Sequence, residues 1–179
     1  MPSVQSRLGN PASLDDLLLY RINRLLGVAG SMVIRLCEGR FGITRREWRV
    51  LAVLGVPGAA AGLLSSQLAE RAQLDRARTS RAVTSLVAKG LLDRQTQPGD
   101  RRQARVTLTP AGRALHDALF PLVCDINREL LALLDDREVA ALDHALQVLQ
   151  QRADQLVLRS TALPKADRRR GGRSHRGMG

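Results

Sequence analysis

Residues 64–108 decide the fold, and their sequence is LSSQLAERAQLDRARTSRAVTSLVAKGLLDRQTQPGDRRQARVTL. The apolar periodicity and the turn residues of this stretch predict a short helix, a turn, a second helix and two strands. These elements are expected, in this order, at Ser65–Ala72, Gln73–Asp75, Arg76–Lys89, Leu91–Gln95 and Ala104–Leu108. The charged segment 96–103, TQPGDRRQ, is the predicted loop between the two strands. The rest of the chain is therefore organised around a helix-turn-helix that a β-hairpin follows.

The second predicted helix has one apolar face and one basic face. Asp75 is placed to cap its N-terminus, and Gly90 is placed to end it in the left-handed conformation. The apolar positions, three and four residues apart, are Ala82, Val83, Leu86 and Val87. The side chains expected on the outer face are Arg76, Arg78, Thr79, Ser80 and Arg81. Such a helix start suits a DNA major groove, because Arg pairs with guanine and Ser or Thr contacts base or backbone. A solvated polar face is the alternative interpretation.

The predicted hairpin carries a second basic feature at its tip. Pro98-Gly99-Asp100 is typical of a turn, and Arg101 and Arg102 follow it. Arginines on such a tip can enter a minor groove, although a solvated tip is the alternative. A helix-turn-helix followed by a basic hairpin is a winged helix, so we predict that double-stranded DNA is a partner. Ser65, Ser66 and Gln67, at the start of the shorter helix, are predicted to contact phosphates.

The composition limits the class of protein. The 179 residues include 44% hydrophobic but only 2% aromatic residues, so the core must consist of Leu, Val and Ala, which suits helices. The net charge of +11 indicates a polyanionic partner. Two cysteines do not make a disulfide framework, and the sequence shows neither a signal peptide nor a membrane span, so we expect a cytoplasmic protein without a membrane partner. The three histidines have no metal-site spacing and no nucleophile or phosphate-loop motif occurs, so no catalytic residue and no metal site are expected.

Two further helices are predicted before the central segment. Ser13 is placed to cap a helix over residues 14–38. Thr44 and Glu47 have the spacing of a capping box at the start of a helix over residues 45–54.

Two long helices are predicted after the central segment. Thr109 is placed to cap a helix over residues 110–134, which contains Pro121 and is expected to kink there. An aspartate at 135–136 caps the last helix, over residues 137–158. The predicted parts of the chain are a flexible lead at 1–13, a helical dimerisation region at 14–38 and 110–158, a winged helix-turn-helix at 44–108, and a disordered Arg-rich tail at 159–179.

The long helices carry apolar residues three and four positions apart along most of their length. Leu18, Ile22 and Leu25 begin such a row in the first helix, and Leu142 and Leu146 belong to the row of the last. Interlocked with a twofold mate, they would hold two DNA-binding helices about 34 Å apart. We therefore expect a homodimer that is mainly α with a small β-hairpin wing. An intramolecular bundle is the alternative.

The sequence resembles the MarR family of transcriptional regulators. The matching text is REWRVLAVL at 46–54, LLSSQLAERAQLDRARTSRAVTSLVAKGLLDR at 63–94, GDRRQARVTLTPAGRAL at 99–115 and DDREVAALDHALQVL at 135–149. The resemblance covers about residues 14–158. It implies a dimeric winged-helix repressor that binds pseudo-palindromic DNA and is released by a small molecule, often an aromatic acid, or by an oxidant. The family's Asp-Arg-Arg pattern implies that Arg102 is the residue inserted into the minor groove.

The resemblance also implies an effector pocket where the dimerisation helices meet the DNA-binding region. The candidate residues for an anionic aromatic ligand are Tyr20, Arg24, Trp48 and His116. Arginine would clamp the carboxylate and the aromatic rings would stack on the ligand, unless Tyr20 and Trp48 belong to the core. The chain as a whole is similar to the family's repressors of nicotinate breakdown and of biofilm polysaccharide, which implies a hydroxynicotinate-like or salicylate-like acid and no other cofactor.

Two other functions stay open at this point. A thiol-based redox-responsive repressor would use Cys37 or Cys124, since the family's peroxide-sensing branch has a reactive cysteine near its N-terminus. Both cysteines would otherwise be small buried hydrophobes. A non-specific basic architectural protein would coat nucleic acid mainly through the Arg-rich tail and show no sequence preference.

Overall fold

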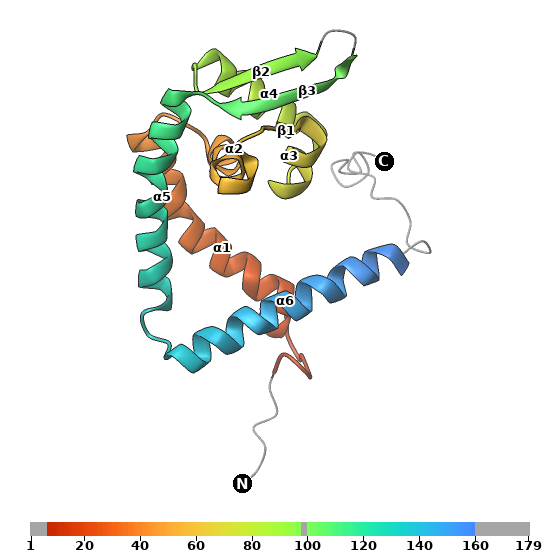
Figure 1. Cartoon of the computed structure of the whole chain (residues 1–179). Helices are drawn as coiled ribbons and strands as arrows, with labels where there is room; N and C mark the ends of the chain where they lie inside the picture. The colour runs from red at the N-terminus through yellow and green to blue at the C-terminus, as the bar shows by residue number, and fades with distance from the viewer. Residues whose placement is uncertain (1–6, 98–99, 160–179) are drawn as a thin grey trace, which may run out of the picture. The chain divides into compact units, whose positions relative to one another are not determined.

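A computed structural model describes residues 7–97 and 100–159, with the side chains of all of these except 96–97 and 100–103. The chain is mainly helical with a small antiparallel sheet, which confirms the predicted fold class (Figure 1). The elements are η1 (Leu14–Asp16), α1 (Leu18–Arg35), η2 (Leu36–Arg40), α2 (Arg45–Gly55), η3 (Pro57–Ala59), β1 (Leu63–Leu64), α3 (Ser65–Arg71), α4 (Arg76–Ala88), β2 (Leu92–Gln97), β3 (Asp100–Leu108), α5 (Pro110–Leu131) and α6 (Asp136–Arg159). The chain divides into two units, Met1–Leu130 and Leu131–Gly179. The predicted disordered tail lies outside the described residues, apart from Arg159.

Three helices begin at the caps that the sequence predicts. At α2, the Glu47 amide donates to the Thr44 hydroxyl at 3.2 Å and the Thr44 amide donates to the Glu47 carboxylate at 2.6 Å. At α5, the Thr109 hydroxyl accepts from an amide of the first turn at 3.0 Å. At α6, the Asp135 carboxylate accepts from the Glu138 amide at 2.8 Å. Each cap satisfies an amide that has no partner inside its helix, so the helix starts are fixed locally.

The first helix does not run unbroken over residues 14–38, so that prediction is wrong in its details. Ser13 caps only the short turn η1, because its hydroxyl donates to the Asp16 carboxylate at 2.8 Å and closes a local turn. Leu17 then has an extended backbone, and α1 begins one residue later. At its other end, α1 continues into the π-helical turn η2, which reaches Arg40.

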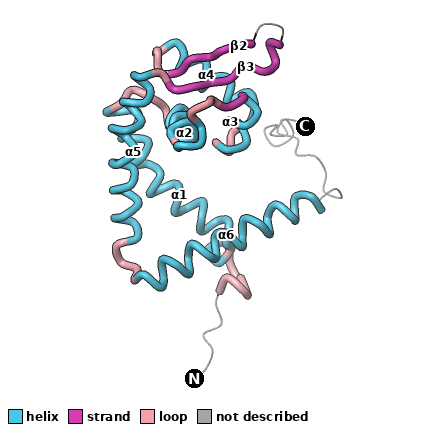
Figure 2. Tube along the Cα trace, viewed as in Figure 1, coloured by secondary structure: helices cyan, strands magenta, loops and turns pink. Residues whose placement is uncertain are grey.

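The sheet belongs to the first unit and has the order β1-β3-β2, with both pairs antiparallel. Val106, near the end of β3, lies opposite Leu63 of β1 and Arg94 of β2. β2 and β3 form a hairpin that extends beyond the short strand β1 (Figure 2). The predicted turn at Pro98-Gly99 lies outside the described residues.

The hairpin strands are longer than the sequence predicts. The segment 96–103 was expected to be a loop, but β2 extends to Gln97 and β3 begins at Asp100. These two residues are paired, with an irregularity in the register just before them. Arg101 and Arg102 are therefore residues of β3 and not of a loop. Polar residues continue the strands here because the ladder bonds come from the backbone and not from the side chains.

The core of the first unit is formed by α2, α3, α4 and the sheet. Leu51, Leu68, Leu86 and Val106 are each 0% exposed, and Leu119 of α5 joins them. Full burial of such a side chain contributes about 1.5–3 kcal/mol to the free energy of unfolding. This packing fixes α4 against α2 and α3 and leaves its other side open.

Much apolar surface stays exposed outside this core. Val87 is 39% exposed, so the prediction that it packs inward is wrong. In α1, Leu19 and Leu25 are 79% and 62% exposed, and α6 contains no buried residue within the described chain. None of the helices among the described residues combines the length and the apolar character that a bilayer crossing requires.

Candidate nucleic-acid interface

The helix α4 starts at a sharply defined turn. Gln73, in this turn, has the left-handed φ of 51°, and Asp75 caps the helix by accepting from the Arg78 amide at 2.7 Å. The Arg78 side chain is 42% exposed, and its Nε lies 3.3 Å from the same carboxylate. Gly90 ends the segment with φ 68°, as the sequence predicts. Asp75 therefore fixes both the start of the helix and the direction of Arg78.

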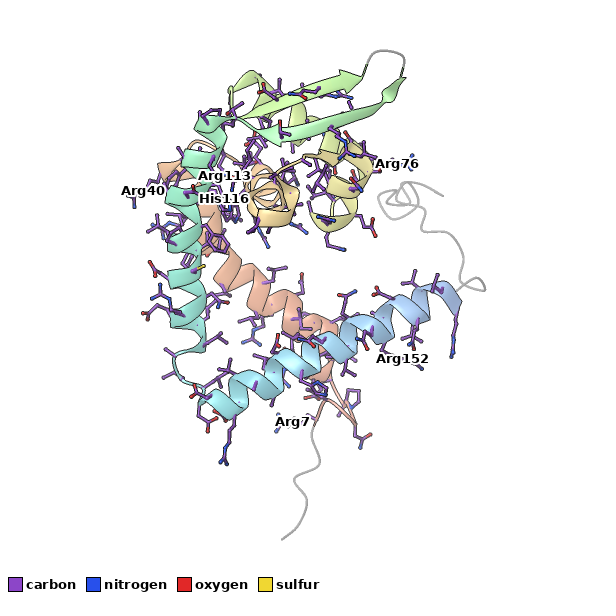
Figure 3. The ribbon with its side chains drawn as sticks, in the orientation of Figure 1. Arg7, Arg40, Arg76, Arg113, His116 and Arg152 are labelled. Carbon is purple, nitrogen blue, oxygen red and sulfur yellow. The ribbon has the colours of Figure 1, made fainter. Side chains whose placement is uncertain are left out.

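The outer face of α4 carries most, but not all, of the predicted residues. Arg76, Ser80 and Arg81 are exposed, and Figure 3 shows Arg76 at the start of the helix, away from α5. Thr79 is only 1% exposed, and its hydroxyl donates to the Asp75 carbonyl at 2.9 Å. The prediction that Thr79 faces outward is therefore wrong, because this residue belongs to the buried side of the helix.

An ion pair between buried Glu47 and the partly exposed Lys89 fixes the other end of this region. Glu47 of α2 is 2% exposed, and its two carboxylate oxygens accept from Lys89 Nζ at 3.1 and 3.0 Å. Lys89 also donates to the Gly42 carbonyl at 2.9 Å. Burial acts to raise the pKa of Glu47, but hydrogen bonds from Ser85, the Thr44 amide and Lys89 outweigh it and leave the pKa below its ordinary value. The charged carboxylate therefore ties the start of α2 to the end of α4.

The three predicted residues of α3 have different surroundings. Ser66 and Gln67 are exposed and Ser65 is half-buried. The Gln67 side-chain oxygen accepts from the Leu64 amide at 2.9 Å, so a residue of the first turn of α3 satisfies the backbone amide at its N-terminus. Contact with DNA phosphates stays a prediction for these residues.

The hairpin carries arginines on both strands, with Arg94 on β2 and three arginines on β3. Arg105 of β3 is exposed and donates to the Gly62 carbonyl at 3.0 Å, which ties the base of the hairpin to the loop before β1. Arg101 and Arg102 follow the turn on the same strand, but their side chains are not among those described. Their insertion into a minor groove stays a prediction.

Two of the predicted effector residues meet in an aromatic cluster, which we define as Trp48, His116 and Phe120. The ring of His116 lies 5.9 Å from that of Trp48 and 5.4 Å from that of Phe120, both in stacked orientations. Trp48 and His116 are 6% and 9% exposed. A Cβ on Gly55 would overlap the His116 ring, so any side chain at the last residue of α2 would force this ring to shift. Figure 3 shows His116 on the side of α5 that faces α2.

The sequence did not identify every residue around this cluster. Phe120 was missed although it lies one helical turn after His116, a spacing at which side chains meet. Arg113 was missed too, and it donates to the Gly55 carbonyl at 2.7 Å from the neighbouring turn of α5. These contacts join α5 to the end of α2.

The other two predicted effector residues do not join the cluster. Arg24 lies 3.5 Å from Asp15, near the start of α1, and its side chain is 71% exposed. Within the described chain, no hydrogen bond, ion pair or ring contact links Tyr20 or Arg24 to Trp48 or His116. The four residues therefore do not form one site within a single chain.

The surroundings of Cys37 differ from those of a reactive thiol. Cys37 is 0% exposed, and burial, followed by the charge of Glu38, raises its pKa. Cys124 is half-buried, and both residues are free thiols. Because the thiolate is the reactive form, the surroundings of Cys37 disfavour a redox sensor at this position.

Comparison with known proteins identifies the kind of molecule to which these features belong. The model of the MarR family matches residues 41–103. A crystal structure of a MarR-family transcriptional regulator from Silicibacter pomeroyi is 30% identical, with a TM-score of 0.65 over 76% of this chain and 90% of that chain.

Two further solved structures are informative. BpsR of Bordetella bronchiseptica is 25% identical, with a TM-score of 0.61 over 73% of this chain and 98% of that chain, and its structure is described as showing how 6-hydroxynicotinic acid regulates DNA binding. MepR of S. aureus, in complex with DNA, is 19% identical, with a TM-score of 0.68 over 76% of this chain and 98% of that chain. At this identity the likeness to MepR shows a shared fold.

Proposed function

Because the chain belongs to the MarR family of transcriptional regulators, we propose that it is a repressor that binds a pseudo-palindromic operator as a homodimer. One observation carries the proposal. The outer face of α4 presents Arg76, Ser80 and Arg81 beside a capped helix start. The ion pair between Glu47 and Lys89 fixes the end of α4 to α2. We call α4 the recognition helix from here on.

The side chains of the recognition helix match the chemistry of a major groove. Arg76 and Arg81 present forked guanidinium groups, which pair with the two acceptors of guanine. Ser80 can contact a base edge or a phosphate, and the start of the helix favours phosphate through its amides. Arg78 is held by Asp75 and adds positive charge at the same end. Ser65, Ser66 and Gln67 of α3 are proposed as phosphate contacts.

The hairpin supplies the second contact with DNA in this proposal. Arg102 is the residue proposed to enter the minor groove, with Arg101 beside it in β3. A narrow A·T-rich minor groove has an enhanced negative potential, which favours an inserted arginine.

Exposed apolar faces support the homodimer. Leu142, Leu146 and Leu149 form one row on α6 and are each at least 40% exposed. A monomer rarely exposes apolar rows of this length, and a twofold mate would cover them. A dimer would also present two recognition helices to the two halves of a palindrome.

A small aromatic acid is the proposed effector. The supporting observations are the stacked rings of the aromatic cluster and the description of BpsR as regulated by 6-hydroxynicotinic acid. Trp48 and His116 would contact the ring, and Tyr20 and Arg24 would have to come from elsewhere, since they do not reach the cluster within one chain. Release of DNA by such an acid typically corresponds to a change in affinity of about 5–150-fold.

Fluorescence anisotropy on short duplexes tests the proposed function. The duplexes are DNA from upstream of the protein's own gene and a scrambled duplex of equal length, each at two salt concentrations. We expect the native duplex to bind about 10³-fold more tightly or better, with two chains per duplex. Addition of 6-hydroxynicotinate should weaken this binding.

Equal binding to both duplexes with a steep dependence on salt would contradict the proposal. That result would mean that the protein recognises only phosphate charge, as an architectural protein does. Retention of specific binding after removal of residues 160–179 would exclude the Arg-rich tail as the main contact.

A further inference from the structure

A basic pocket lies beside the start of the recognition helix, and no residue of the aromatic cluster lines it. It lies between α1, α2, the turn before α4 and α4 itself, and it has a volume of about 420 Å³. We call it the arginine pocket, after the four arginines in its lining, which are Arg45, Arg46, Arg49 and Arg78. Pockets that hold small ligands have volumes of about 300–1,000 Å³.

Positive charge exceeds negative charge in the arginine pocket. Arg78 is balanced by Asp75, at 3.3 Å. The other three arginines form no salt bridge with any carboxylate in the part of the chain that the structure describes. Glu38 is the acidic residue among the lining residues. The two carboxylates of Glu38 and Asp75 can neutralise two of the four arginines. Two positive charges therefore remain without a counter-charge.

Burial and a neighbouring positive charge both act on Arg49. Burial and then the nearby charge of Arg45 lower the pKa of the Arg49 guanidinium below its ordinary value. Arg49 donates to the Gln73 carbonyl at 3.3 Å, which accounts for one of the five N–H donors of a guanidinium. A carboxylate in the pocket would supply both the missing negative charge and acceptors in the forked geometry of arginine.

Three of the remaining lining residues are apolar, beside the polar Thr44 and Gln73. Leu26 and Ile34 of α1 and Leu74 of the turn before α4 form this apolar wall. A phosphate ion has nothing to place against such side chains. A ligand that combines acidic groups with an apolar body fits both walls at once.

We propose that the arginine pocket binds a small organic dianion, with two carboxylates on an apolar ring or chain. The carboxylates contact the guanidinium groups of Arg45 and Arg49, and the body lies against Leu26, Ile34 and Leu74. The ligand site is distinct from the aromatic cluster.

The position of the pocket couples it to the recognition helix. Arg78 also lines a second hollow of about 210 Å³, together with Arg81 and Ser85 of the same helix. A dianion that draws Arg78 into the arginine pocket moves the positive charge of Arg78 away from the second hollow, where Arg81 lies. This coupling to DNA rests on the proposed function, whereas binding of the dianion does not.

Isothermal titration calorimetry without DNA tests the binding. The probes are phthalate as the dianion, benzoate as the monoanion, benzamide as the neutral analogue and inorganic phosphate as the anion without an apolar body. We expect phthalate to bind at least about tenfold more tightly than benzoate or phosphate, and benzamide not to bind, because each charged hydrogen bond is worth about a tenfold change or more. Absence of phthalate binding, or equal binding of phthalate and phosphate, would overturn the proposal.

Paired substitutions locate the site. Arg45→Gln with Arg49→Gln should weaken phthalate binding at least about tenfold, while the matched exposed control Arg152→Gln should leave it unchanged. Arg45→Lys with Arg49→Lys keeps the charge but not the forked donors, and it should bind phthalate with intermediate affinity. Circular dichroism checks that each variant is folded, and the lysine pair provides the test if the glutamine pair does not fold. Unchanged phthalate affinity in a folded pair would overturn the assignment.

A DNA-binding experiment tests the coupling separately. Phthalate should weaken binding of the wild-type protein to its specific duplex about fivefold or more, and the Arg45→Lys/Arg49→Lys pair should respond less. Phthalate binding without any change in DNA affinity would overturn the coupling. Failure of the protein to prefer any duplex would instead contradict the proposed function and would leave the calorimetric result standing.

Discussion

The DNA-binding region from α2 to β3 and the helices α1 and α6 have similar apolar sequence patterns but differ in how far their apolar side chains are buried. Leu68 and Leu86, in α3 and α4, are 0% exposed, whereas Leu25 of α1 and Leu146 of α6 are 62% and 48% exposed. The hydrophobic core of the first region is formed by residues of one chain. The two helices instead expose apolar rows, which a second chain would cover. The difference shows that the DNA-binding region has its own core, whereas α1 and α6 expose the apolar rows that we propose as the dimer interface.

The largest expected difference between the two regions concerns stability. Leu86→Ala removes a fully buried side chain and should lower the free energy of unfolding by about 2–5 kcal/mol. Leu158→Ala removes a side chain of α6 that is 80% exposed and lies outside the row of Leu142, Leu146 and Leu149, so it should change this free energy by less than about 0.5 kcal/mol. Urea denaturation followed by circular dichroism measures both. Equal losses would mean that the two regions do not differ in this way.

A second substitution tests whether the exposed row of α6 is a dimer interface. Leu142→Asp with Leu149→Asp places two charges in the row and should yield a folded monomer, as measured by light scattering. Operator affinity should fall about 100-fold or more, because one recognition helix then binds without the other. Gln151→Asp, on the same helix but outside the row, is the control. A dimer that survives the double substitution would contradict the proposed interface.

A third experiment compares two matched helix caps, one in each region. Asp75→Ala and Asp135→Ala each remove a carboxylate that accepts from an amide in the first helical turn, and each should cost about 1 kcal/mol of stability. Asp75→Ala should also weaken DNA binding, since Asp75 orients Arg78 at the start of the recognition helix. DNA affinity reduced equally by both substitutions would argue against a local role for Asp75.

The smallest expected effect concerns pH and Glu47. Because the folded state holds the pKa of Glu47 below its ordinary value of 4.5, its stabilising effect is complete above that value and is lost as the pH falls through the lower, folded-state pKa. The wild-type protein should therefore lose more stability than Glu47→Gln between about pH 6 and pH 3. Thermal unfolding of both proteins across this range measures the difference. Parallel loss in the two proteins would contradict the role of the charged carboxylate.

The caps and turns were predictable from the sequence because their chemistry is local. Thr44 with Glu47, Asp75 and Thr109 each need only a neighbour three residues away, and all three cap the predicted helices. Gly90 likewise has the positive φ expected of a residue that ends a helix.

Other features depend on what the rest of the chain brings near, so the sequence did not predict them. Thr79 was expected outside because it is polar, but its hydroxyl is satisfied by the preceding turn and the side chain packs inward. The arginine pocket requires Arg45 and Arg49 to meet the turn at Gln73, which lies 24 residues further along the chain from Arg49. Tyr20 was grouped with Trp48 by resemblance alone, and the fold of one chain does not join them.

One measurement tests the central claim that the outer face of the recognition helix recognises DNA sequence. It is the ratio of affinities for the native and the scrambled duplex, determined by anisotropy for the wild-type protein, Arg81→Ala and the exposed control Arg152→Ala. We predict that Arg81→Ala lowers this ratio about tenfold or more, since one specific base contact is worth about 1–3 kcal/mol, and that Arg152→Ala leaves it unchanged. A folded Arg81→Ala protein that keeps the wild-type ratio, or a control that loses it equally, would contradict the claim.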